Sequence, residues 1–217
     1  MPRSHPSKRA AGRRKQQSKA ASVFLNIPYD SAFEKLFLAY IAGVSAFGLT
    51  PRAAVEVPFE KRRLDRILSL ISASQYSIHD LSRVQLDRFS PRVPRFNMPF
   101  ELGLTVALSR RSRARHRWIV CESKSHRLNK SLSDLDGTDP YIHDGTIRGV
   151  FRELSNAFVL VNQRLSVGQI MAIYRVLRGN LELVLRNAGA KDPFNARVFK
   201  DLCIVAGRAA EELVARR

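Results

Sequence analysis

Residues 22–44, SVFLNIPYDSAFEKLFLAYIAGV, decide the fold of this chain. Residues 22–28 form a short apolar run that ends at a proline, which is the pattern of a buried strand. Apolar side chains then repeat three and one residues apart, as they do along one face of an amphipathic helix: Phe33, Leu36, Phe37, Tyr40, Ile41 and Val44. The change of period predicts a strand that leads directly into a helix.

The same alternation continues along the chain. We expect further strands at residues 50–57, 76–81 and 117–122, and further helices at 64–71, 98–111 and 147–158. Residues 83–97 and 124–145 are rich in polar residues and are expected to be loops. Strands that alternate with helices predict an α/β fold, in which a parallel sheet has helices on both faces. Ligands of such sheets bind beyond the carboxyl ends of the strands, which directs attention to residues 26–30, 80–83 and 97 onward.

The two ends of the chain differ from this central domain, which we place at residues 22–162. Residues 1–21 are basic and polar and are expected to be a disordered arm. Residues 163–217 contain two amphipathic patterns, at 167–187 and 195–215, which predict a C-terminal extension of two helices. These helices could pack on the domain or on a second copy of the chain.

The chain is strongly basic, with 37 Lys and Arg residues against 19 Asp and Glu residues and a formal net charge of +18. Such a charge attracts polyanions, so nonspecific nucleic-acid binding through the basic arm is one hypothesis. A solubilising tail and a transit peptide are the alternatives for the same arm. A second basic cluster lies between Arg83 and Arg117. Its part around Arg110–Arg117 is interpreted as a solvated helix end, with a phosphate-binding patch for nucleic acid or an anionic ligand as the alternative.

Composition excludes several classes of protein. An apolar content of 45% argues against wholesale disorder, and no apolar run approaches the roughly 18 residues of a membrane span, so we expect no membrane contact. Cys121 and Cys203 are isolated, which favours a reducing, cytoplasmic location and argues against a disulfide scaffold. The histidines show no zinc spacing, so no metal is expected. The sequence contains neither a dinucleotide-binding glycine motif nor a P-loop, which argues against a Rossmann dehydrogenase and a P-loop NTPase.

Two histidines call for separate interpretations. His79 precedes Asp80 in the expected strand, so the two side chains should face opposite sides of the sheet, and His79 is interpreted as a core residue. His143 lies in the polar stretch 124–145, where it could be solvated or could reach a crevice.

The segment NMPFELGLTVAL, residues 97–108, holds the main candidate for chemistry. Asn97 is suited to cap the helix, and Glu101 would then lie near the positive end of the helix dipole. With Arg83 or Arg95 nearby, we expect Glu101 to be ionised at neutral pH unless it is strongly desolvated. An ionised carboxylate is suited to sugar hydroxyls or a cationic carbon rather than to general-acid catalysis. The alternative is an ordinary glutamate that interacts with the dipole. Phe100 is expected on a buried stripe with Leu104 and Leu108.

Three motifs together carry a resemblance to a known family: a strand ending in NIPYD, a strand ending in HDLS and a helix beginning FNMPFELG. They resemble a bacterial group of TIR-like domains that are related in fold to nucleoside 2-deoxyribosyltransferases, over about residues 22–160. The resemblance implies a flavodoxin-like sheet and an enzyme that cleaves or transfers at the N-glycosidic bond of NAD or a related nucleotide. It also implies a homo-oligomer and a role as a bacterial defence or signalling effector.

The resemblance assigns roles to individual residues. Glu101 would be the catalytic carboxylate, acting on an oxocarbenium-like centre or forming a glycosyl intermediate. Asp80 and Ser82 would line the sugar site, with Asn97 in support, while Tyr29 and Asp30 would flank the base or the phosphates. Asn26 and Arg83 complete the expected substrate-binding set, and NAD or a nucleotide is the one ligand expected.

Other features depart from the family. The segment between Asp80 and Glu101 is longer than in compact relatives and rich in arginine, and the helices of residues 163–217 lie outside the common domain. A nucleotide-sensing or interaction module that uses the same crevice without catalysis therefore stays open as an alternative.

Overall fold

The computed structural model describes most of the chain, namely residues 20–56, 62–84, 93–111, 116–135, 137–163 and 165–216. Nearly all of the expected basic arm, residues 1–19, lies outside the described residues, as do residues 85–92 of the arginine-rich segment.

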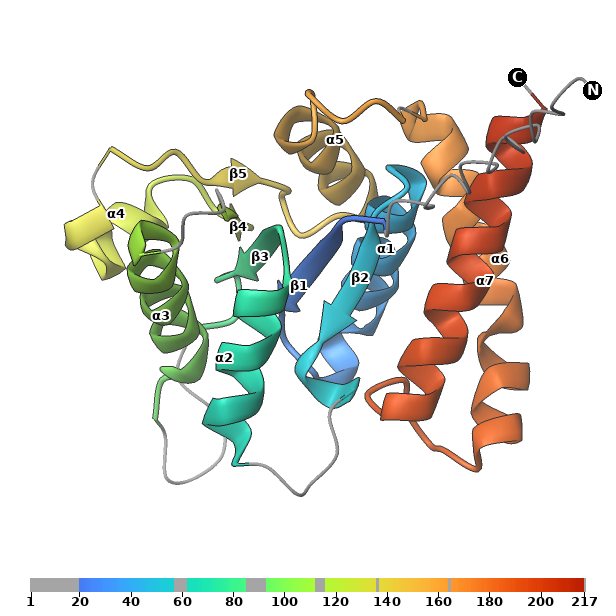
Figure 1. Cartoon of the computed structure of the whole chain (residues 1–217), viewed down its shortest axis with the longest axis horizontal. Coiled ribbons are helices and arrows are strands. Elements are labelled where there is room, and N and C mark those ends of the chain that lie inside the picture. The colour runs from blue at the N-terminus through green and yellow to red at the C-terminus, as the bar shows by residue number, and fades with distance from the viewer. Residues whose placement is uncertain are drawn as a thin grey trace, which may run out of the picture.

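A five-stranded parallel sheet forms the centre of the molecule (Figure 1). Its strand order is β2-β1-β3-β4-β5, which is the flavodoxin-like order, and the direction in which strands are added reverses between β1 and β3. The strands are β1 Ser22–Asn26, β2 Thr50–Ala53, β3 Tyr76–Asp80, β4 Arg117–Glu122 and β5 Tyr141–Ile142. The predicted α/β class and parallel pairing are confirmed.

Helices cover both faces of the sheet. On one face, α2 (Arg63–Ala73) and α3 (Asn97–Arg111) pack on side chains such as Phe24 of β1. On the other face, α1 (Glu34–Ala46) and α5 (Ile147–Ala157) share a core with Val23 and Leu25. Successive β1 residues are buried on opposite faces, which explains why this strand is apolar throughout.

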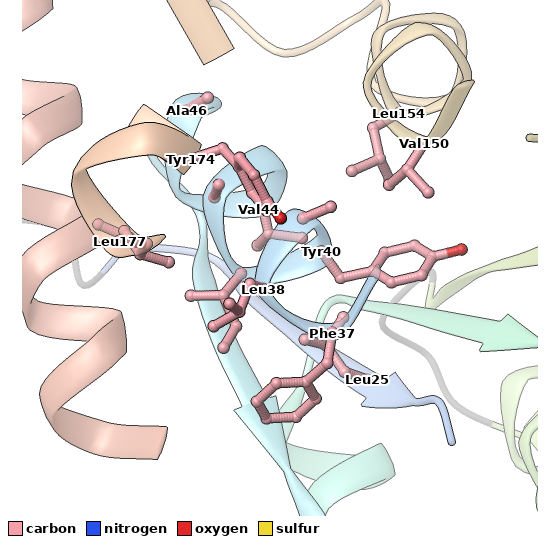
Figure 2. Packing of buried hydrophobic residues seen from close by; sticks show 14 of the residues in the cluster. Leu25, Phe37, Leu38, Tyr40, Val44, Ala46, Val150, Leu154, Tyr174 and Leu177 are labelled. Carbon is pink, nitrogen blue, oxygen red and sulfur yellow. The ribbon is translucent and has the colours of Figure 1, made fainter. Parts of the chain in front are cut away.

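The C-terminal helices α6 (Val167–Ala188) and α7 (Ala196–Ala215) form a hairpin that packs on α1. Figure 2 shows α1 with Leu177 of α6 on one side and Val150 and Leu154 of α5 on another. The buried residues of α6 and α7 belong to the same apolar cluster as Leu25 of β1. The extension is therefore part of the domain core in this structure.

Two element predictions were wrong in detail. The second strand ends at Ala53 instead of continuing to residue 57, because the Glu56 carboxylate accepts from the Ala53 amide at 2.6 Å and folds the chain into a 3-10 turn at Ala54–Glu56. The stretch 124–145, expected to be a loop, contains the short helix α4 (Arg127–Ser131) and β5. A strand of two residues is too short to show a period in the sequence.

In the described part of the chain, none of the helices combines the length and apolar character that crossing a bilayer requires.

Candidate functional site

A pocket of about 370 Å³ opens where β1 ends and α3 begins. This position is the carboxyl end of the strands beside the β1–β3 reversal, where ligands of this sheet order bind. Its polar lining combines cations, amides, a phenol and a carboxylate from several segments: Asn26, Tyr29, Arg63, Arg95, Asn97 and Glu101.

Glu101 is buried, with 4% of its surface exposed, and lies in the second turn of α3. Burial raises the pKa of this carboxyl from 4.5 to about 7, and the positive charge of Arg63 offsets part of the increase. Among the described residues, no side-chain donor bonds to its carboxyl oxygens. Glu101 therefore meets the exception of strong desolvation, because the loss of hydration outweighs the favourable charge of the nearby cation, and its carboxyl group holds its proton over more of the neutral pH range than an exposed glutamate does.

The start of α3 differs from the expected cap. The Phe100 amide donates to the Phe96 carbonyl at 3.0 Å, so Phe96 holds the N-cap position and Asn97 is the first helical residue. Phe100, expected to be buried, is 56% exposed while its neighbour Glu101 is buried. A buried glutamate next to an exposed phenylalanine reverses the usual pattern, and such reversals are typical of functional sites.

Asn26 and Tyr29 bring the end of β1 to the pocket. The Asn26 Nδ2 atom donates to the Met98 carbonyl at 3.0 Å and so joins β1 to the first turn of α3. The Tyr29 hydroxyl donates to the Leu25 carbonyl at 3.3 Å, and its ring contacts Phe194 in the connection between α6 and α7. Burial raises the pKa of Tyr29, and the negative charge of Glu101 adds to the increase.

Asp30 lies beside the pocket and acts as a tether. Its Oδ1 atom accepts from the Phe33 amide at 3.1 Å, while Oδ2 pairs with Arg95 at 2.7 Å and with Arg83 at 3.3 Å. Arg83 and Arg95 stand on either side of residues 85–92, so Asp30 ties the described ends of this segment to β1. Arg95 lines the pocket, whereas Asp30 and Arg83 are not part of the lining.

Asp80 and Ser82 lie outside the described lining of this pocket. Asp80 is fully buried, and its carboxylate accepts from the Tyr40 hydroxyl at 2.7 Å and from the Ser82 amide and hydroxyl at 2.8 and 2.5 Å. The His143 Nε2 atom lies 3.1 Å from the same carboxylate. These contacts join α1, the end of β3 and the segment after β5, so the Asp80 cluster (Tyr40, Asp80, Ser82 and His143) holds the loops together and leaves Asp80 no exposed surface.

The alternation of β3 explains this separation. His79 faces the α3 side, where its ring bonds with Asn26 at 2.9 Å, and the next residue, Asp80, faces the α1 side. The prediction that His79 and Asp80 point in opposite directions is confirmed, and His79 is fully buried. The expectation that Asp80 shares a sugar site with Glu101 does not agree with this geometry, since Asn26 and Glu101 belong to the His79 side.

Arg63 is the pocket residue that sequence reasoning missed. In the sequence it lies between Arg62 and Arg66 on the polar side of the helix expected at residues 64–71, and its side chain is exposed. Its position as the first residue of α2 nevertheless places it in the pocket lining, where its charge acts on Glu101. The signal available in the sequence was a run of arginines at a helix start beside the carboxyl ends of the strands.

Within the ranges that the structure describes, no group of three or more histidine, cysteine, aspartate or glutamate side chains is arranged to hold a metal ion.

In comparisons with known proteins, no family model matches this chain, and no curated protein or solved structure matches it.

Proposed function

We propose that this protein cleaves or transfers at the N-glycosidic bond of NAD or a related nucleotide, with Glu101 as the catalytic carboxylate. The observation that carries the proposal is a buried glutamate, without a side-chain donor among the described residues, in a pocket that also holds Arg63 and Arg95. Burial of an uncompensated carboxyl group lowers the stability of the fold, and such a group in a cleft at the strand ends is typical of a functional site.

The pocket residues would have different roles in this reaction. Breaking an N-glycosidic bond develops positive charge on the anomeric carbon, which a fixed carboxylate stabilises or attacks. Nicotinamide leaves NAD without needing a strong general acid, so the ionised form of Glu101 would be the active one. Arg63 and Arg95 supply positive charge for phosphate oxygens, and Asn26, Asn97 and Tyr29 supply neutral hydrogen-bonding groups.

The resemblance of the motifs to TIR-like domains supports the same reaction class. A role as a defence or signalling effector and assembly into a homo-oligomer are part of the proposal, because they are implied by that resemblance.

The test is release of nicotinamide from NAD by the purified full chain, followed by chromatography. We expect Glu101→Gln to lower the rate by at least about 100-fold, because the fixed charge that faces the developing cation is removed. Glu182→Gln is the matched control, since Glu182 is exposed on α6, and it should retain the full rate.

Equal release by the wild-type and Glu101→Gln proteins would contradict the assignment of Glu101. If NAD binds to both proteins in calorimetry and neither releases nicotinamide, the nucleotide-sensing alternative is correct instead.

A further inference from the structure

A row of buried polar side chains leads away from the pocket along the α3 side of the sheet. Asn26 Nδ2 lies 2.9 Å from His79 Nδ1, and His79 Nε2 lies 3.0 Å from Ser77 Oγ. Ser77 Oγ in turn lies 2.9 Å from His116 Nε2, and His116 Nδ1 lies 2.8 Å from the Ser74 carbonyl oxygen. The row therefore connects the pocket with the opposite end of β3.

The two ends of the row set the direction of every hydrogen bond in it. A carbonyl oxygen can only accept, so His116 must carry its proton on Nδ1 to donate to Ser74. Nε2 of the neutral ring is then an acceptor, and the Ser77 hydroxyl donates to it. Ser77 Oγ accepts from the Nε2 proton of His79, which leaves His79 Nδ1 as the acceptor of an Asn26 amide hydrogen.

The contacts of Asn26, at the end of the row that lies in the pocket, independently support this order of donors and acceptors. The second amide hydrogen of Asn26 is directed to the Met98 carbonyl at 3.0 Å. Both rings are neutral, since burial lowers the pKa of His79 to about 3 and also lowers the pKa of His116. With both amide hydrogens engaged, Oδ1 is the atom that Asn26 has left to offer a ligand.

We infer that Asn26 is a specificity-determining residue that presents a hydrogen-bond acceptor to the ligand and selects for a hydroxyl or N–H donor. The inference rests on the proposed function for the identity of the ligand, and on the hydrogen-bond row for the orientation of the amide. Turning the amide around would give up the bond to Met98 and place its oxygen against the lone pair of His79 Nδ1. A ligand group that can only accept would face the oxygen of Asn26 unpaired, and the lost hydrogen bond corresponds to about tenfold weaker binding.

The orientation is tested directly by long-range ¹⁵N–¹H correlation spectra of the full chain at pH 7.5, which report the protonated nitrogen of each histidine. We expect the proton on Nε2 of His79 and on Nδ1 of His116. A proton on Nδ1 of His79 would overturn the inference, because Asn26 would then have to turn its oxygen inward.

Ligand selection is tested with three probes, AMP, 2′-deoxy-AMP and 3′-deoxy-AMP, by calorimetry. One deoxy probe should bind at least about tenfold more weakly than AMP to the wild type. Ser77→Ala and His116→Leu break the row outside the pocket lining, so each should reduce that ratio at least about threefold. His116→Gln is the matched control, because its amide can donate to Ser74 and accept from Ser77, and it should keep the ratio.

A wild-type ratio near one, or the same ratio in all four proteins, would overturn the inference. If none of the three probes binds, adenosine monophosphates are not ligands of this pocket and nicotinamide release alone decides the proposed function, while the histidine tautomers decide whether Asn26 is oriented as inferred.

Discussion

Asp80 and Glu101 are two of the buried carboxyl groups near the carboxyl ends of the strands; they lie on opposite faces of the sheet, and their surroundings differ. Asp80 is fully buried and accepts from Tyr40 and from both the amide and the hydroxyl of Ser82. Glu101 is 4% exposed, receives no side-chain donor from the described residues and has a pKa of about 7. The protein satisfies the hydrogen bonds of the Asp80 carboxylate, whereas Glu101 is the group that we propose meets a ligand.

This difference indicates a structural role for Asp80 and supports the functional role that we propose for Glu101. Donors compensate Asp80 for its loss of hydration, so its burial stabilises the packing of α1 against the strand ends. Glu101 is not compensated in this way, and its charged form lowers the stability of the fold. The two groups should therefore respond to amide substitution with opposite signs.

The largest effect is expected for Asp80→Asn. The new amide nitrogen would face donors such as the Tyr40 hydroxyl at a position with no exposed surface, so the free energy of unfolding should fall by about 4 kcal/mol. Urea denaturation followed by circular dichroism measures this loss. Asp192→Asn, an exposed substitution in the α6–α7 connection, is the control and should leave the stability unchanged. A loss below about 1 kcal/mol for Asp80→Asn would contradict the structural role of Asp80.

A smaller effect of the opposite sign is expected for Glu101→Gln. The folded-state pKa of Glu101, about 7, lies above its ordinary value of 4.5, so the folded protein keeps the proton between these values while the unfolded chain loses it. Wild-type stability therefore declines as the pH rises from 4.5 through 7, by up to about 3 kcal/mol.

The glutamine variant lacks this decline. At pH 8 it should be more stable than the wild type, and at pH 4.5 the difference should vanish, as measured by urea denaturation at both values. A difference that does not change with pH would show that Glu101 is not titrating in the folded protein near pH 7.

The smallest effect is expected for Arg63→Gln. The charge of Arg63 lowers the pKa of Glu101, so its removal should raise that pKa and move the pH profile of NAD cleavage to higher pH. Since the ionised carboxylate is the proposed active form, the rate at saturating NAD should fall by no more than about tenfold at pH 7 and recover at pH 9, while loss of the proposed phosphate contact raises KM at both pH values. Arg62→Gln, one residue earlier and outside the pocket lining, should leave the profile in place.

The sequence predicted the sheet because strands and helices of ordinary length show their periods. Residues 22–28 and 33–44 correspond to β1 and α1 with small differences at their ends. Strand β5 was missed because two residues carry no period, and β2 was predicted too long because the Glu56 carboxylate that ends it acts through a side-chain contact.

The sequence predicted some of the residues of the candidate site, and physical reasons explain both the agreement and the differences. Glu101, Asn26, Tyr29 and Asn97 lie together in one pocket, since strand ends and helix starts converge at one edge of a parallel sheet. The ionisation of Glu101 depends on burial, which its position in the helix does not reveal. The family resemblance grouped Asp80 with Glu101 in a sugar site, although strand alternation turns the Asp80 side chain to the other face of the sheet.

The most direct test of the account is the rate of NAD cleavage per folded molecule in the wild type, Glu101→Gln and Asp80→Asn, with the folded fraction measured by circular dichroism. The account predicts that Glu101→Gln stays folded and loses cleavage. Asp80→Asn should keep the wild-type rate per folded molecule, because its total cleavage falls only in proportion to the protein that unfolds. Full cleavage by Glu101→Gln, or a well-folded Asp80→Asn protein that no longer cleaves NAD, would contradict the separation of a functional carboxyl group from a structural one.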